Sequence, residues 1–120
     1  MSETREPAPS VPASDPTRPA APFDVFDAHC PSRAVLTDVA KRWSVLVLGA
    51  LGDGPLRFGQ LAARIDGISE RMLSETLKTL RHDGLVQRNG TEYALTADGQ
   101  LVAARAIALF ASLYTVLGER

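Results

Sequence analysis

The chain has 120 residues, 45% of them apolar, and a formal net charge of −1. A chain of this length supports one small domain, and the near-neutral charge excludes a strongly basic nucleic-acid binder. The single cysteine excludes an intramolecular disulfide framework and a multi-cysteine zinc site.

Charge and proline content divide the chain. Residues 1–29 hold five acidic residues and two arginines, whereas residues 30–120 hold eleven basic and nine acidic residues. Residues 1–22 contain six of the eight prolines, and such a segment cannot bury enough apolar surface to offset its ordering entropy. We therefore expect a disordered Pro/Ala-rich tail over 1–22 and a mildly basic domain over 23–120.

The sequence does not resemble that of a secreted or membrane protein. Its acidic, proline-rich N-terminus has no apolar core, so it is not a secretory signal. Its longest apolar runs are broken by charge or glycine well short of a membrane span. We expect a cytoplasmic protein with no membrane partner.

The first half of the domain is predicted to be mostly helical. Residues 32–40 fit a short helix, and residues 43–51 are apolar on nearly all sides, which favours a helix at the centre of the core. The sequence GDGP at 52–55 predicts a turn. A short strand at 56–58 and a third helix over 59–65 follow.

The second half combines a helix with a hairpin. Ser69 is a natural N-cap for a fourth helix over 70–83, and Gly84 can take the left-handed conformation that ends it. Asn89-Gly90, between two short β-type runs, predicts a two-residue hairpin turn. The two strands are 85–88 and 91–95.

The last predicted helix, over 97–117, is broadly apolar for the end of so small a domain. A helix of this kind needs cover on more than one side, so we expect it to pack against a second subunit. Its apolar residues form one stripe and a wider flank: Leu101, Ala104, Ala108, Ala111 and Tyr114 or Thr115, then Ile107, Leu109, Phe110, Leu113 and Leu117.

This order of elements predicts a winged helix-turn-helix: mainly α with a small β-hairpin, dimerising through its terminal helices. In such a fold the second helix of the turn pair fits the major groove of B-DNA, which is about 12 Å wide. The hairpin forms the wing beside the DNA backbone.

The sequence resembles the HxlR-type (DUF24) transcriptional regulators, relatives of the MarR group, over residues 30–118. No single segment is specific, but together they follow the family's order at nearly its spacing. The matching segments are Cys30-Pro31, Arg42-Trp43, Gly54-Pro55, Arg57-Phe58 with Leu61, Gly67-Ile68-Ser69, Arg71-Met72-Leu73 with Leu77 and Leu80, Asp83-Gly84-Leu85-Val86 with Arg88, and Tyr93-Ala94-Leu95-Thr96 with Gly99.

The resemblance implies a dimeric DNA-binding regulator packed through its first and last helices. Two-fold symmetry then predicts a pseudo-palindromic operator in double-stranded DNA. Two departures stand out. The wing, Arg88–Thr91 between the strands, is shorter than similar proteins usually have, and Arg81-His82 stands where acidic residues are common.

The fourth helix supplies the main candidate DNA contacts. Arg71 can bond guanine O6 and N7 together, and Ser74 can contact base or phosphate. Glu75 can accept a hydrogen bond from cytosine N4 or orient Arg71 or Lys78 along the helix. Lys78 fits a phosphate contact. The alternative is an ordinary solvated face with intrahelical ion pairs.

Other candidate DNA contacts lie outside this strip. Arg57 and Gln60 begin the first helix of the pair and can hold phosphates. Arg88 and Thr91 at the wing can contact phosphate or the rim of the minor groove, or simply form a polar hairpin tip. Ser69 joins this set at the N-terminus of the fourth helix.

Cys30 has two interpretations. In some relatives the cysteine at this Cys-Pro position senses oxidants or electrophiles. His29, Arg33 and a helix beginning near Ser32, its candidate N-cap, would each lower the thiol pKa and raise the thiolate fraction. The alternative is a small buried residue that packs a dimer interface.

A second route for a signal is a small ligand between the terminal helices, as in MarR-like relatives. The aromatic residues that could line such a space are also typical of a plain core, and nothing in the sequence names a ligand. They are Phe23, Phe26, Trp43, Phe110 and Tyr114.

An enzyme is not expected. His29 and His82 are far apart, no lysine-serine pair follows the glycines of GALGDGP, and no nucleophile has a convincing base. We expect no catalytic residues, metal or cofactor. The remaining alternative is a winged helix that contacts only proteins.

Overall fold

The computed structural model describes residues 24–118. The predicted tail over 1–22 lies outside the described residues, as does Phe23. The chain forms two compact units, one up to Thr37 and the other from Asp38 onward.

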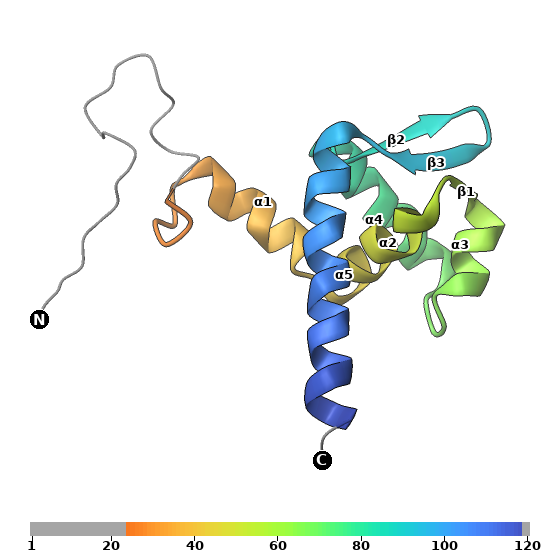
Figure 1. Cartoon of the computed structure of the whole chain (residues 1–120). Helices are drawn as coiled ribbons and strands as arrows, with labels where there is room; N and C mark the ends of the chain where they lie inside the picture. Colours follow the sequence, from red (N-terminus) through yellow and green to blue (C-terminus); the bar gives the residue numbers. More distant parts are fainter. Residues whose placement is uncertain (1–23, 119–120) are drawn as a thin grey trace, which may run out of the picture. The chain divides into compact units, whose positions relative to one another are not determined.

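The first unit contains a turn and most of helix α1 (Pro31–Val39), shown in orange in Figure 1. The turn is built from three successive backbone hydrogen bonds, from Asp27 to Asp24, from Cys30 to Asp27 and from Arg33 to Cys30. The expected N-cap at Ser32 was wrong, because α1 already begins at Pro31. Proline suits the first helical position, since its fixed φ is helical and its missing N–H would have no partner there.

The second unit has the expected order of helices and strands, with one short 3₁₀ turn added. A third strand joins the predicted hairpin, because residues 56–57 pair with it. The elements are α2 (Arg42–Ala50), the 3₁₀ turn η2 (Leu51–Asp53), β1 (Leu56–Arg57), α3 (Phe58–Arg64), α4 (Glu70–His82), β2 (Val86–Asn89), β3 (Glu92–Leu95) and α5 (Ala97–Gly118).

The sheet has the order β1-β3-β2 and is antiparallel throughout. Asn89 pairs with Glu92, so the two-residue turn is Gly90-Thr91 and not Asn89-Gly90 as expected. Gly90 has φ 66°, which glycine adopts without steric cost. A hairpin with glycine first in its turn matches the right-handed twist of the flanking strands.

The core of the second unit lies where α2, α3 and α4 meet, and α5 packs along α2 (Figure 1). As the apolar pattern of 43–51 predicted, α2 contributes central residues. Gly49 in α2 and Gly52 in η2 allow a close approach of α5, because a Cβ on Gly49 would collide with Phe110 and one on Gly52 with Ile107. The most deeply buried side chains are Val47, Leu48, Leu51, Leu61, Leu73, Leu77 and Leu80.

The predicted stop of α4 at Gly84 is confirmed. Gly84 has φ 78°, its N–H donates to Arg81 O, and the N–H of Leu85 donates to Leu80 O. These two bonds satisfy the last carbonyls of the helix in a Schellman motif. Burial of Leu80 and Leu85 adds the apolar contact that usually accompanies it.

Thr96 joins the end of α4, the wing and the start of α5. Its hydroxyl donates to Gly84 O at 2.6 Å and accepts from the N–H of Gly99 at 3.0 Å, so it caps α5. Its own N–H donates to Leu85 O at 3.0 Å. Gly99 lies against this junction, because a Cβ there would overlap the carbonyl oxygen of Leu85.

We predict that Gly99→Ala lowers the free energy of unfolding by about 1–3 kcal/mol, because backbone at the junction must shift to admit a methyl group. Gly59→Ala is the matched control. Gly59 lies in α3 with open space around it, so alanine should raise stability by up to about 1 kcal/mol. Urea unfolding at one protein concentration measures both. Equal effects of the two substitutions would contradict the assigned packing of Gly99.

Candidate nucleic-acid interface

Helices α3 and α4 form the helix-turn-helix pair. As predicted, Ser69 is the N-cap of α4, and its hydroxyl accepts a hydrogen bond from the N–H of Met72 at 3.0 Å. The helix carries Glu70 in its first turn and Arg81 and His82 in its last, which matches the helix dipole at both ends. The N-terminus of α4 is therefore well defined, and its first turn is open to solvent.

The two faces of α4 are as predicted. Leu73, Thr76, Leu77 and Leu80 are buried against the core. The opposite strip is exposed along its whole length. It consists of Arg71, Ser74, Glu75, Lys78 and His82.

Within this strip Arg71 and Glu75 form an ion pair one helical turn apart, with Nε 3.3 Å from Oε2. This pair is expected both if Glu75 orients Arg71 and if the strip is an ordinary solvated face with intrahelical ion pairs. Both side chains are exposed, and exposed pairs of this type contribute only about 0.3–0.5 kcal/mol. Arg71 can therefore leave Glu75 at little cost.

The start of α3 holds the next candidates. The backbone N–H of Arg57 donates to Gln60 Oε1 at 2.8 Å, so the Gln60 carbonyl closes the first turn of α3. The Gln60 side chain could therefore contact a phosphate only by donating a hydrogen bond from its amide NH₂ group. Arg57, Gln60 and Arg64 are all exposed.

The wing presents Arg88 and Thr91 at its exposed tip. Arg88 is held locally, because its Nε donates to Gly90 O at 3.0 Å and its guanidinium lies 5.6 Å from the centre of the Tyr93 ring. The remaining N–H groups of the guanidinium are left for another partner. The short tip and this local anchor limit how far Arg88 can extend.

Asp83, which closes α4, is half-buried beside Asp38. Among residues 24–118 its Oδ2 has no hydrogen-bond donor, because an ionised carboxylate beside it can only accept. Burial and the neighbouring Asp38 raise the pKa of Asp83 to about 6, while His82 lowers it. Protonation of Asp83 or Asp38 would supply an O–H group that can donate a hydrogen bond to the other carboxyl group. Sequence reasoning missed this pair, which joins two distant positions.

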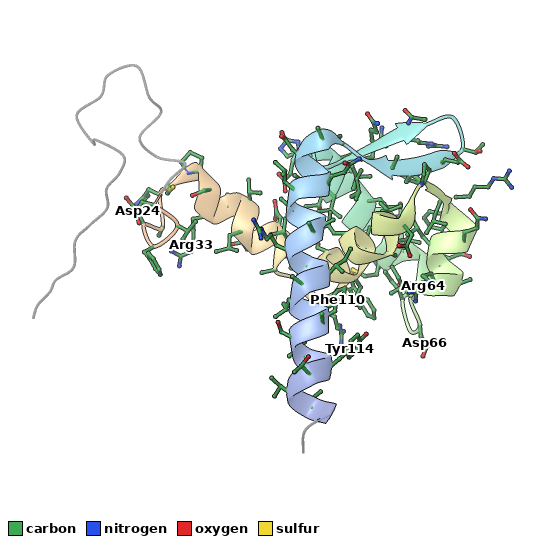
Figure 2. The ribbon with its side chains drawn as sticks, viewed as in Figure 1. Asp24, Arg33, Arg64, Asp66, Phe110 and Tyr114 are labelled. Carbon is green, nitrogen blue, oxygen red and sulfur yellow. The ribbon has the colours of Figure 1, made fainter. Side chains whose placement is uncertain are left out.

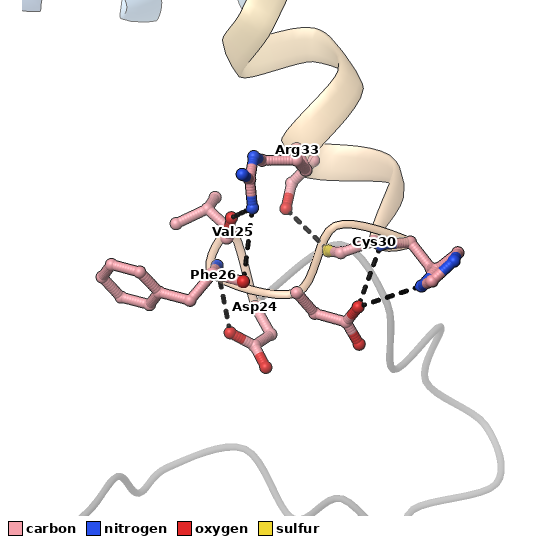
Figure 3. Close-up of polar contacts among 8 residues, drawn as sticks. Asp24, Val25, Phe26, Cys30 and Arg33 are labelled. Atoms are coloured by element: carbon pink, nitrogen blue, oxygen red, sulfur yellow. Dashed lines mark hydrogen bonds and ion pairs between the residues drawn. The ribbon is translucent and has the colours of Figure 1, made fainter.

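Cys30 lies in the first unit, directly before α1, and is 4% exposed. Its Sγ is 2.8 Å from the hydroxyl of Ser32 (Figure 3). Burial raises the pKa of the thiol, but hydrogen bonds from the Ser32 side chain and from backbone groups outweigh it, so the pKa is lowered overall.

The charges expected to act on Cys30 are engaged elsewhere. His29 lies 3.6 Å from Asp27, and the Arg33 guanidinium donates to Val25 O and Phe26 O at 3.1 and 3.2 Å (Figure 3). Hydrogen bonding around Ser32, and not a neighbouring cation, is thus the cause of the lowered pKa.

An open groove of about 540 Å³ lies between α2, α5 and the α3–α4 connection. Of the aromatic residues predicted to line a ligand space, Phe110 and Tyr114 border this groove, facing Arg64 and Asp66 (Figure 2). Trp43 does not border this groove but stacks against Arg42, whose guanidinium carbon lies 4.3 Å from the centre of the Trp43 ring. Phe26 belongs to the first unit.

Residues 38–115 match the sequence profile of the family described as HxlR-like helix-turn-helix. The chain belongs to this family. Over 93 residues it is 41% identical to the HTH-type transcriptional regulator YtfH of Escherichia coli K12, an uncharacterised protein, and the match covers 72% of this chain and 74% of that one. The chain is therefore a transcriptional regulator of the HxlR/MarR type, and relatives of this kind are not enzymes.

Solved structures of HxlR-type proteins have the same winged-helix fold. The structure of ytfH from Salmonella typhimurium, described as a transcriptional regulator, is 37% identical, covers 80% of this chain and 92% of its own, and has a TM-score of 0.72. The quinone-bound YodB of Bacillus subtilis is 32% identical, covers 76% and 100% of the two chains, and has a TM-score of 0.61.

Helix α5 is the most apolar element of this HxlR-type chain. An 18-residue window within its 22 residues has a mean hydropathy of 1.8, so by length and composition alone α5 could cross a membrane. As expected from the sequence, charge interrupts the apolar residues of this helix, because Arg105 lies within it. Its C-terminal half exposes Leu109, Leu113, Tyr114, Val116 and Leu117.

Proposed function

We propose that this HxlR-type regulator binds a pseudo-palindromic operator in double-stranded DNA as a homodimer in the cytoplasm. The observation that carries the proposal is the α4 strip, where Arg71, Glu75 and Lys78 are exposed opposite a buried leucine face. In a helix-turn-helix the first turns of the second helix approach base edges. Arg71 lies in that turn and offers the bidentate donor that guanine accepts.

Flanking groups would hold the backbone of the DNA. Ser69, Ser74, Lys78, Arg57 and Gln60 offer donors to phosphate on either side of Arg71, and Arg88 and Thr91 offer them at the wing. Such contacts set register and salt dependence without specifying sequence.

We predict that Arg71→Ala weakens operator binding by about 1–3 kcal/mol and relaxes the base preference at one position of each half-site. The physical reason is the loss of a bidentate contact to guanine. Fluorescence anisotropy on DNA from upstream of its own gene, followed by footprinting, measures affinity and position.

Lys41→Ala is the control for loss of one positive charge, because Lys41 is exposed directly before α2 and lies outside α3, α4, the wing and the α5 face proposed for the dimer. Its removal should leave affinity nearly unchanged. Equal losses for both variants would indicate only a general charge effect. If the wild type binds no DNA even at low salt, the winged helix is instead a module for protein contacts.

The homodimer is proposed from the exposed apolar side of α5. Leu109, Leu113 and Val116 recur at spacings of four and three residues, which places them on one helix face. Contiguous exposed apolar surface of this kind marks a protein interface. A second copy would bring the same face, and its two-fold symmetry would pair two α4 helices with two half-sites.

We predict that the double variant Leu109→Glu with Leu113→Glu is a monomer and loses operator binding, because charges cannot be buried against the partner helix. Thr115→Glu is the control, since Thr115 is exposed on a different side of α5. Light scattering after size-exclusion chromatography gives the mass. A double variant that stays dimeric would move the interface away from this face.

Electrophile sensing by Cys30 is proposed as the signal. The lowered pKa increases the thiolate fraction, and the relative YodB has been crystallised with a quinone bound. A thiolate adds through sulfur to a ring carbon of a quinone, and the electron pair moves to a carbonyl oxygen, which takes a proton from solvent. The hydrogen on the attacked carbon is then lost as a proton and the second oxygen is protonated, which gives the aromatic hydroquinone thioether. Because Cys30 is buried beside Ser32, an adduct requires the turn before α1 to open.

We predict that benzoquinone changes the DNA affinity of the wild type several-fold and leaves Cys30→Ser unchanged, because Cys30 is the only cysteine of the chain. Intact-mass spectrometry should show one adduct on the wild type and none on the variant. An adduct that leaves affinity unaltered would make Cys30 a packing residue and not a sensor.

The groove beside α5 supports an alternative signal, a small molecule. Phe110 and Tyr114 offer apolar contacts there, and Arg64 offers a cation to an acidic ligand. Tyr114 is 75% exposed, so a second subunit would have to close the groove. This alternative shares the proposed dimer but not the thiol chemistry.

A further inference from the structure

Met72 is an apolar side chain exposed on the helix proposed to enter DNA. Among the large apolar side chains exposed within residues 24–118, it is the one that belongs to α4, and it is 38% exposed. The other exposed side chains of that helix are polar or charged. Singly exposed apolar side chains are ordinary on protein surfaces, so the notable feature of Met72 is its position on the helix turn proposed to approach DNA.

The position of Met72 is fixed by the capped first turn of α4. Its N–H donates to the Ser69 hydroxyl, so Met72 is the third helical residue. At 100° per residue, its side chain lies between the buried face that contains Leu73 and the exposed strip that contains Glu75. It therefore borders the Arg71–Glu75 pair within the turn that approaches base edges.

The major groove offers one apolar group, the C5-methyl of thymine. Methionine is flexible and polarisable, and it adapts to small apolar surfaces. Arg71, Ser74 and Lys78 are suited to bases and phosphates with polar groups but cannot gain from a methyl group. We propose that Met72 contacts the C5-methyl group of a thymine in each half-site. This inference rests on the proposed DNA binding.

The test replaces single thymines by deoxyuridine, which removes only the methyl group. The probe is a duplex selected from a random library by the wild-type protein and then synthesised with each thymine replaced in turn. Loss of one buried methyl contact should weaken wild-type binding about fourfold at one position of each half-site. Met72→Ala should bind the thymine and deoxyuridine duplexes equally.

Two variants separate this contact from a general loss of affinity. Met72→Leu keeps an apolar side chain and should retain most of the preference for thymine. Lys78→Ala should lower affinity for the thymine and deoxyuridine duplexes by the same factor. Circular dichroism and thermal unfolding check that α4 is intact in each variant.

The outcomes distinguish the two proposals. If the wild type selects no duplex, both DNA binding and the role of Met72 are overturned. If it selects a duplex but binds the deoxyuridine duplexes as tightly at every position, DNA binding stands and the role of Met72 is overturned. The same holds if Met72→Ala still discriminates against deoxyuridine.

Discussion

Burial of the leucine face of α4 is the constraint on which the rest of the structure depends. Leu73, Leu77 and Leu80 are almost completely buried, and each such side chain contributes about 1.5–3 kcal/mol. Because the helix repeats every 3.6 residues, fixing these three also fixes which residues face away from the core. The direction of Arg71 and Lys78 is thus a consequence of core packing.

The junction at Thr96 extends this constraint to the wing and α5. The hydroxyl of Thr96 bonds to Gly84 and Gly99, and its backbone N–H bonds to Leu85. The end of α4, the residue that leads into β2 and the start of α5 therefore share a single point of attachment. The wing itself is short, and Arg88 is anchored to Gly90 and Tyr93. In the proposed DNA complex, sequence preference would then come mainly from α4, and the attachment joins α5 to the end of that helix.

Local patterns predicted most of this fold, and the differences arise where distant residues meet. The leucine spacing, the Ser69 cap and the Gly84 stop are properties of neighbouring residues, so the sequence was sufficient for them. The hairpin turn was displaced by one residue, because the pairing of Asn89 with Glu92 depends on the whole strand register. Asp38 beside Asp83 could not be predicted from local sequence either, since no pattern links them.

The mixed chemistry of the α4 strip has a physical reason that the weak overall charge makes clear. Residues 30–120 carry only two more basic than acidic residues, so the counterion release that drives nonspecific binding is small. In the proposed complex, weak nonspecific attraction makes the base contacts of α4 more important than the phosphate contacts, which set only register and salt dependence. Glu75 pairs with Arg71 in the free protein and is repelled by phosphates, so approach to the wrong sequence leaves its charge uncompensated. In the proposed complex, a site that gives Arg71 a guanine and Glu75 a hydrogen-bond donor would replace the ion pair that the two side chains lose.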